Sequence, residues 1–144
     1  MLRRKKKIET TSSRSKAMAK ADKYFSLFIR LRDCMPYQGK AGRCISCGKL
    51  IPFEDGDCGH YINRQHMSLR YSELNCNFQC RHCNRFDEGN IQGYRKGLIQ
   101  KIGLTKVEML EAMKYTTNKL SAFELEAIAK DYKQKAEELK KQII

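Results

Sequence analysis

The residues of this chain best suited to binding a metal are two Cys-x-x-Cys pairs, Cys44/Cys47 and Cys80/Cys83, separated by the 32 residues 48–79. A tight turn with this spacing directs two sulfurs at one ion, and two such turns supply the four tetrahedral ligands of a zinc site. Such a site is closed to water. We therefore expect its zinc to stabilise the fold and to take no part in chemistry.

Three further cysteines, Cys34, Cys58 and Cys76, make the total odd at seven. An odd count, and a basic N-terminus with no apolar stretch behind it, argue against a secreted protein held by disulfides. The chain has no run of 18 apolar residues, so no membrane-spanning helix is predicted. We expect a cytoplasmic protein without membrane association, in which the paired cysteines bind zinc and the other three are small buried hydrophobic residues.

Polar residues suited to hydrolysis lie between and beside the cysteine pairs. His60 follows Gly59 in an extended stretch, Asn75 comes 15 residues later, and Asn84 directly follows Cys83. A histidine with a pKa near neutrality can remove a proton from water, and an Asn carbonyl can bind a hard cation. Each residue alone could equally be structural, as a buried hydrogen-bonded histidine or a turn or cap asparagine. Their order relative to both cysteine pairs favours catalysis.

That order resembles the HNH, or His-Me finger, nucleases, and within them the zinc-containing branch typified by phage endonuclease VII. A more specific resemblance, over about residues 43–103, is to the phage lambda NinG (Rap) family of recombination nucleases. It leaves residues 1–40 and 104–144 unassigned. The residues that carry it in combination are Gly59-His60, Arg70, Asn75, Gln79-Cys80, Cys83-Asn84-Arg85, Gly89-Asn90 and Tyr94.

The resemblance implies a DNA endonuclease with a catalytic Mg²⁺ or Mn²⁺ beside the structural Zn²⁺. In that mechanism His60 is the general base, Asn84 binds the catalytic metal, and Asn75 is a hairpin clamp that orients the loop carrying His60. An alternative has His60 bind the metal itself while His66 acts as the base. His82, inside the second cysteine pair, is a surface or phosphate contact or a spare ligand, and His66 is similar.

One position departs from the HNH pattern. Many HNH enzymes have an acid or a histidine directly before the base as a second metal ligand, whereas this chain has Gly59. Asp57 would face the same side of a strand as Gly59, so it is the first candidate to replace that ligand. Asp87 and Glu88, one helical turn beyond the metal-binding asparagine, are the alternatives.

The positive charge of the chain indicates a polyanionic partner. The net charge is +13, and residues 1–40 alone carry 12 Lys or Arg and three acids, a net charge of +9. Blocks of basic residues commonly contact nucleic acid, and arginines can clamp phosphate with two donors, although nearby acids could pair with them instead. The candidate DNA contacts are Arg64, Arg70, Arg81, Arg85, Arg3, Arg4, Lys5, Lys6 and Lys7.

Nothing in the sequence resembles a helix that reads the major groove, so we expect recognition of DNA backbone and shape. The family resemblance further implies branched recombination intermediates, such as D-loops and Holliday junctions, in a bacterial host. Symmetric cutting of a junction would need a homodimer, which the apolar faces of the C-terminal helices could form. Two other classes stay open: a non-catalytic zinc-finger DNA-binding module, and a zinc-ribbon adaptor for protein interactions.

The elements that must position these residues are short strands and several helices. The predicted fold class is α+β, with a small zinc-bound ββα-metal (His-Me finger) core and flanking α-helices. The predicted organisation is a basic flexible arm over 1–14, a basic amphipathic helix over 15–34, a zinc-stabilised ββα nuclease core over 40–103 and C-terminal helices over 104–144.

Within the core, residues 50–53 and 58–62 are candidate strands joined by an acidic turn, and residues 84–101 read as one helix that Asn90 re-caps. Two capping boxes open the C-terminal helices, Thr105-x-x-Glu108 and Ser121-x-x-Glu124.

Overall fold

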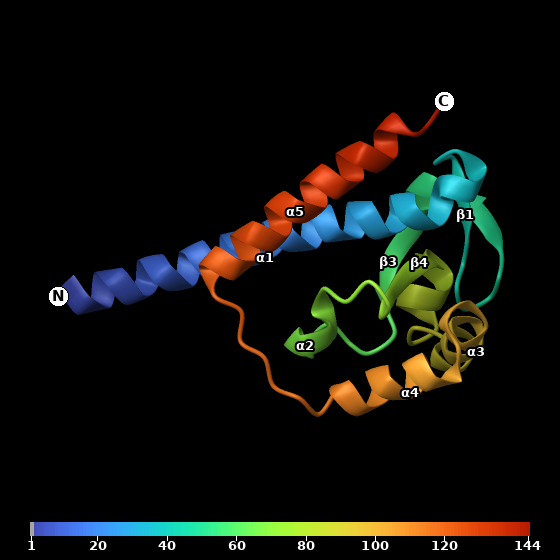
Figure 1. Cartoon of the computed structure of the whole chain (residues 1–144). Helices are drawn as coiled ribbons and strands as arrows, with labels where there is room; N and C mark the ends of the chain where they lie inside the picture. The colour runs from blue at the N-terminus through green and yellow to red at the C-terminus, as the bar shows by residue number, and fades with distance from the viewer. Residues whose placement is uncertain (1) are drawn as a thin grey trace.

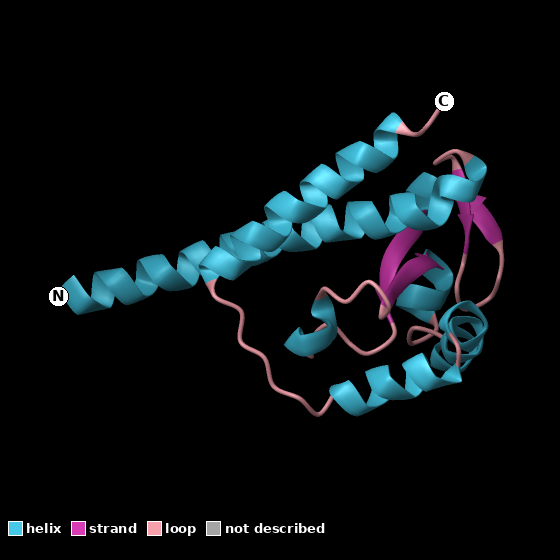
Figure 2. Cartoon of the chain, viewed as in Figure 1, coloured by secondary structure: helices cyan, strands magenta, loops and turns pink. Residues whose placement is uncertain are grey.

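The computed structural model describes the backbone of residues 2–144 and the side chains from Ser13 onward. Helices predominate, and two small two-stranded antiparallel sheets lie between them (Figures 1 and 2). The mixed α and β composition agrees with the predicted class. None of the described helices is both long and apolar enough to cross a membrane.

The longest helix, α1 (Leu2–Cys34), lies along α5 (Ala122–Lys141). Arg14 bonds the carbonyl of Leu120, Lys20 pairs with Glu126, and Gln38 accepts from the amide of Ile144. All three pairs are separated by 106 residues, so the two segments run in the same direction, as Figure 1 shows. A parallel pair needs a long connection, and here that connection is the whole cysteine-rich core.

The α1–α5 contact changes character along its length. Near the start of α5, alanines on both helices allow a close approach, with Ala17 and Ala21 packed against Ala129. Further along, aromatic residues fill the gap, and the rings of Phe25 and Tyr132 meet edge to face with centroids 4.8 Å apart. Ala17, Ala21, Phe25, Phe28 and Leu31 recur at helical spacing and are all buried, which agrees with the amphipathic helix predicted over 15–34.

Each sheet is a pair of short strands. β1 (Ala41–Arg43) pairs with β2 (Leu50–Pro52), and β3 (Gly56–His60) pairs with β4 (Cys76–Cys80). In the second sheet His60 is opposite Cys76 and Gly56 is opposite Cys80. The chain between β3 and β4 includes the short helix α2 (Met67–Arg70). This pairing brings the cysteine that opens the second Cys-x-x-Cys pair beside the start of β3.

Helices cover the rest of the core. A five-residue π-helical turn, His82–Phe86, follows β4 and precedes α3 (Ile91–Ile102) and α4 (Leu104–Met113). A second apolar cluster, separate from the α1–α5 contact, joins these helices to the loop after β3. Its buried members are Tyr61, Leu69, Tyr94, Leu98, Val107 and Leu110.

Several expected boundaries need correction. Residues 2–14 are helical and continuous with α1, where the sequence predicts a flexible arm. The two predicted strands around the acidic turn lie in different sheets, and that turn is a 3₁₀ helix over Phe53–Asp55. The partner of β3 is β4, in which apolar Cys76 and Phe78 alternate with polar Asn77 and Gln79, and all four side chains are buried.

The helical boundaries differ too. The predicted helix over 84–101 is two pieces, because Glu88, Gly89 and Asn90 all have positive φ. Asn90 does cap the second piece, its side chain accepting from the amide of Gly93. Ser121 caps α5 as predicted, whereas α4 begins at Leu104 behind Gly103 and makes no use of Thr105 as a cap.

Candidate metal centre and catalytic cleft

The four paired cysteines converge. The sulfurs of Cys44, Cys47, Cys80 and Cys83 all lie within 4.8 Å of one another, and the sulfurs of Cys47 and Cys80 are 3.9 Å apart. The first pair sits on the turn between β1 and β2. There the amide of Gly48 donates to Cys44 O at 2.8 Å, and that of Cys44 donates to Lys49 O at 2.9 Å. Gly48 has φ of +76°, which a glycine adopts without strain.

The second pair begins where β4 ends. The amide of Cys83 donates to the sulfur of Cys80 at 3.4 Å, as expected in a turn that points its donors at a thiolate. The side-chain amide of Asn90 donates to the sulfur of Cys83, also at 3.4 Å. Asn90 therefore has two roles, since it also caps α3. It anchors the start of that helix to the cysteine cluster.

The ionisation of the cluster is consistent with cation binding. Burial opposes ionisation of Cys44, but hydrogen bonds from the backbone of Cys80, Cys47 and Ser46 outweigh it and lower the pKa of that thiol. Burial raises the pKa of Cys83 to about 12, and the neighbouring thiols add to the effect. A divalent cation would offset the burial and the mutual repulsion that oppose ionisation of these thiols. Four thiolates at tetrahedral spacing are zinc ligands. The cluster could hold a structural zinc.

A polar cavity of about 860 Å³ opens beside the second sheet. It brings together residues from distant parts of the chain, including Asp22 of α1, His60 of β3, Arg70 of α2 and Asn84 of the π-helical turn. A smaller cavity beside it shares Cys58 and Asn84 and adds Asp57. His60 and Asn84, which the sequence predicted as catalytic, thus face one cleft.

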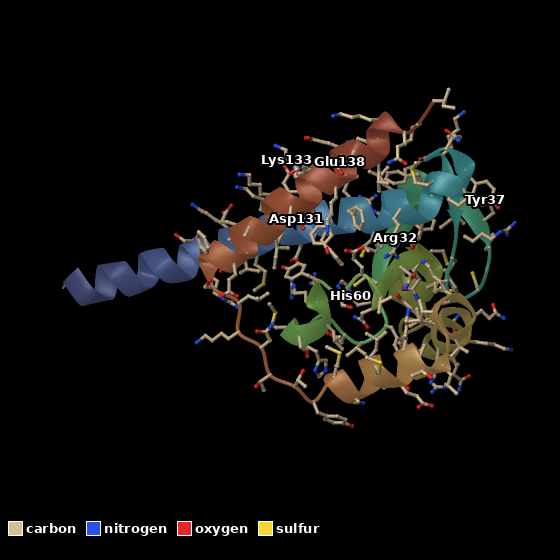
Figure 3. The ribbon with its side chains drawn as sticks, viewed as in Figure 1. Arg32, Tyr37, His60, Asp131, Lys133 and Glu138 are labelled. Carbon is tan, nitrogen blue, oxygen red and sulfur yellow. The ribbon has the colours of Figure 1, made fainter. Side chains whose placement is uncertain are left out.

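His60 ends β3 and points into the interior beside α2 (Figure 3). Its Nε2 lies 3.0 Å from the carbonyl oxygen of Arg70, which can only accept, so Nε2 carries the proton and Nδ1 has the lone pair. Burial lowers the pKa of His60 below its ordinary value of 6.5, and the bond to Arg70 offsets this in part. The ring is therefore neutral at neutral pH.

The carbonyl that holds His60 is itself held by α1. The guanidinium of Arg70 grips Asp22 with two bonds, Nε to Oδ1 at 2.9 Å and Nη2 to Oδ2 at 2.6 Å. The hydroxyl of Tyr71 donates to Asp22 as well, at 2.8 Å. Arg70 is thus a positioning residue for the histidine, and its side chain is already occupied. No local pattern in the sequence marks Asp22 as a site residue, because it is a single acid on a basic helix.

Asn75 is completely buried and ties together the loop that follows His60. Its side-chain oxygen accepts from the amide of Ile62 at 2.8 Å. Its nitrogen donates to the carbonyls of Ile62 and Leu69 at 3.0 and 3.2 Å. The carbonyls of Asn75 and Gly59 both accept from the buried hydroxyl of Tyr94. This geometry is that of a clamp on the loop, the position that the sequence predicts for Asn75.

Asn84 contacts Asp57, the first candidate for the missing metal ligand. Its Nδ2 donates to Asp57 Oδ2 at 3.0 Å, and Arg85 grips both oxygens of Asp57 at 2.9 and 2.8 Å. Position 59 cannot supply a ligand, because a Cβ there would collide with the side chain of Gln79. Gln79 is needed where it is, since it bonds Ser46 and the carbonyl of Gly89.

The remaining candidate acids and histidines differ in whether they line the cavity. Glu88 lines the large cavity and Asp87 does not. His66 precedes α2 and is not among the residues that line the cavity, and His82 is exposed. The described side chains therefore favour Asp57 or Glu88 over Asp87 beside Asn84.

Three of the four arginines predicted to bind phosphate already bond to other groups of the protein. Arg70 pairs with Asp22, Arg85 pairs with Asp57, and Arg81 bonds the carbonyl of Glu54 and lies 3.6 Å from Asp55. Arg64 is exposed at the cavity and makes no side-chain ion pair among the described residues. The side chains of Arg3, Arg4, Lys5, Lys6 and Lys7 lie outside the described residues.

Comparison with known proteins gives one consistent family. The sequence pattern described as bacteriophage lambda NinG protein matches residues 2–142. The proteins named ninG of Salmonella phage P22 and of Escherichia phage lambda are each 34% identical to the chain over 128 residues, which is 88% of this chain and 59% of each relative. The chain thus spans about three-fifths of their length. No solved structure matches it. The chain belongs to the NinG family of phage proteins.

Proposed function

We propose that the chain is a metal-dependent, structure-selective DNA endonuclease that hydrolyses phosphodiester bonds in branched recombination intermediates, in the host cytoplasm. The observation that carries the proposal is the single polar cleft lined by both His60 and Asn84. The order of β3, β4 and a helical turn, with the histidine on the first strand and the asparagine on the turn, is the order expected of a ββα nuclease core.

His60 has the properties of a general base. Its ring is neutral and fixed through Nε2, which leaves the lone pair of Nδ1 to accept a proton from water. The bond to the Arg70 carbonyl also stabilises the imidazolium that forms, because a carbonyl dipole favours the charged ring. The role of the Asp22–Arg70 pair is to keep this carbonyl in place.

Asn84 and Asp57 offer oxygen donors for a hard cation. Their side chains are already in contact, and one amide oxygen with one carboxylate is enough protein for Mg²⁺, which retains several waters. Bound Mg²⁺ or Mn²⁺ would supply positive charge beside the leaving oxygen of the scissile phosphate. Arg85 neutralises Asp57 in the structure, so we propose that Arg85 turns from Asp57 to a phosphate when DNA and metal bind.

The proposal of DNA binding is supported by the positive charge and by exposed hydrogen-bond donors. The net charge of +13 favours a polyanion, and Arg64 projects its donors at the cavity where a phosphate would enter. The apolar face of α5 packs on α1, so it is not available for the homodimer that symmetric junction cutting needs. A dimer would have to use other surfaces, such as the exposed Phe123.

The test uses a labelled four-way DNA junction with Mg²⁺ or Mn²⁺. We expect cleavage by the wild type, and loss of at least 100-fold in rate for His60→Ala, which removes the base. Asn84→Ala should be rescued in part by higher metal concentration, because it weakens the metal site alone. Glu108→Ala is the control, an exposed side chain on α4 that lines neither cavity and should leave the rate unchanged.

Equal cleavage by the wild type and His60→Ala would exclude His60 as the base. Binding of the junction without cleavage under any of these metals would favour the second candidate, a non-catalytic zinc-containing DNA-binding module, which the positive charge and the cysteine cluster alone could support.

A further inference from the structure

The second sheet carries a metal-ligand cluster that is separate from the four paired cysteines. The sulfurs of Cys58 and Cys76 and a ring nitrogen of His60 all lie within 4.8 Å of one another. The register of the sheet explains why. Cys58 and His60 are two residues apart on β3 and therefore point to the same face, and Cys76 of β4 is the cross-strand partner of His60.

We propose that Cys58, His60 and Cys76 form a second zinc site, with three protein ligands and a fourth position open to the cleft. Zinc bonds of about 2.3 Å to sulfur and 2.0–2.1 Å to nitrogen require ligand atoms roughly 3.5–3.8 Å apart. The three ligand atoms lie within 4.8 Å of one another, so a modest contraction brings them to zinc-binding distances.

The surroundings of the cluster fit a metal site. Cys58 and His60 both line the large polar cavity, so water can complete the coordination from that side. A metal bound through Nδ1 would leave the Nε2 proton on the Arg70 carbonyl, which is the orienting contact that metal-binding histidines make through their second nitrogen. Cys76 is fully buried behind the other two, which closes the site on the core side.

The chemistry of the ligands selects the metal. Two thiolates and an imidazole suit a borderline ion such as zinc, whereas Mg²⁺ takes oxygen ligands. The cleft therefore offers two different sites: a sulfur and nitrogen site at Cys58, His60 and Cys76, and an oxygen site at Asp57 and Asn84. A zinc ion at the first site occupies the ring of His60 and prevents it from accepting a proton. Only this last consequence rests on the proposed nuclease function.

The test is the zinc stoichiometry of the full chain, reduced with a phosphine and titrated with Zn²⁺ against a chromogenic chelator. The wild type should bind two equivalents, with the second more easily removed by chelator. Cys58→Ala and His60→Ala should each bind one. Cys34→Ser is the matched control, a buried free cysteine outside both clusters, and should bind two. Circular dichroism shows whether each variant has folded.

Substitution with Co²⁺ gives an independent readout. The first equivalent should produce the charge-transfer absorption of a four-thiolate site, and the second should add a weaker sulfur contribution that is absent in Cys58→Ala. One equivalent in the wild type, or two in both Cys58→Ala and His60→Ala, would overturn the proposal. The count decides this whether or not the chain cleaves DNA. If it does, the second equivalent of Zn²⁺ should slow cleavage by the wild type in Mg²⁺.

Discussion

The four-cysteine cluster and the cleft are held together in different ways. In the cluster, each pair of sulfurs comes from one short turn, and the donors that support them come from the same turns or from Asn90 nearby. In the cleft, every candidate functional group depends on a distant element. His60 is held by Arg70, Arg70 is held by Asp22 of α1, and Asn84 is held by Asp57.

The cysteine cluster therefore stabilises the folded core, whereas the contacts of the cleft position individual side chains within it. The cluster connects the β1–β2 hairpin to the end of β4, so losing it leaves the two sheets joined by hydrogen bonds such as those from Ile45 to Phe78 and from Gln79 to Ser46. The cleft is an assembly of hydrogen bonds and ion pairs on a frame that already exists, so its members can be changed one at a time. We therefore expect effects that decrease steadily from the cluster to the outer surface of α1.

The largest effect should come from Cys80→Ser. The variant loses one zinc ligand and with it a large part of a binding free energy on the order of 10 kcal/mol, so we expect the core to unfold and to release the zinc of the four-cysteine cluster. Zinc content and thermal melting followed by circular dichroism measure this. Cys34→Ser, a buried cysteine that belongs to neither cluster, should keep both. A folded Cys80→Ser protein with unchanged zinc content would show that the cluster is not structural.

Asn75→Ala should have the next largest effect. Its side chain makes three hydrogen bonds inside the core, and their loss removes the partner of the Ile62 amide and of the Ile62 carbonyl, while the Leu69 carbonyl still accepts from the amide of Ser72. Each buried group left unsatisfied costs about 1–3 kcal/mol, so we expect a loss of about 3 kcal/mol in the free energy of unfolding by urea. Asn63→Ala, in the same loop but exposed, should change it by less than about 1 kcal/mol. Similar values for both variants would contradict the clamp.

The same division between local and distant contacts decides which features could be predicted from the sequence. The cysteine cluster was predictable because a Cys-x-x-Cys turn places two ligands by local geometry alone. The caps at Asn90 and Ser121 were predictable for the same reason. The apolar stripe of α1 was predictable from its helical period.

The rest depends on tertiary partners that leave no local pattern. The burial of both faces of β4 could not be predicted, because its polar Asn77 and Gln79 are satisfied by Tyr94, Lys101 and Ser46 from other elements. The role of Asp22 could not be predicted because its partners Arg70 and Tyr71 are 48 and 49 residues away. The pairing of β3 depended on a register that the sequence does not specify.

Asp22→Asn tests the support of His60 from α1. Removing the charge weakens both bonds to Arg70, and because Asp22 is partly exposed we expect a loss of about 1–2 kcal/mol in the free energy of unfolding. The negative charge of Asp22 raises the pKa of His60, so the variant should lower that pKa further. An NMR titration of the His60 ring measures the shift. An unchanged His60 titration would show that Asp22 does not act on the cleft.

The pH dependence of stability gives a smaller effect with a definite sign. Burial lowers the pKa of His60 in the folded state below the unfolded value of 6.5, so the unfolded chain takes up the proton first as pH falls. The contribution of His60 is complete above pH 6.5 and is lost as pH falls through the lowered folded pKa. Urea unfolding at pH 7.5 and at successively lower pH should show this loss, and His60→Gln should lack it. An identical pH profile for both proteins would contradict the lowered pKa.

Glu126→Gln should have the smallest effect, and it is the matched control for Asp22→Asn. Both acids pair with a base across an interface of α1, but the Lys20–Glu126 pair is about half exposed on each side while the side chain of Arg70 is only 12% exposed. Water screens the outer pair, and holding two long side chains in place costs entropy. We expect a change below about 0.5 kcal/mol in the free energy of unfolding by urea, and no change in the His60 titration. A loss equal to that of Asp22→Asn would mean that α1 stabilises the molecule equally along its whole length, and the distinction between its contact with the cleft and its contact with α5 would fail.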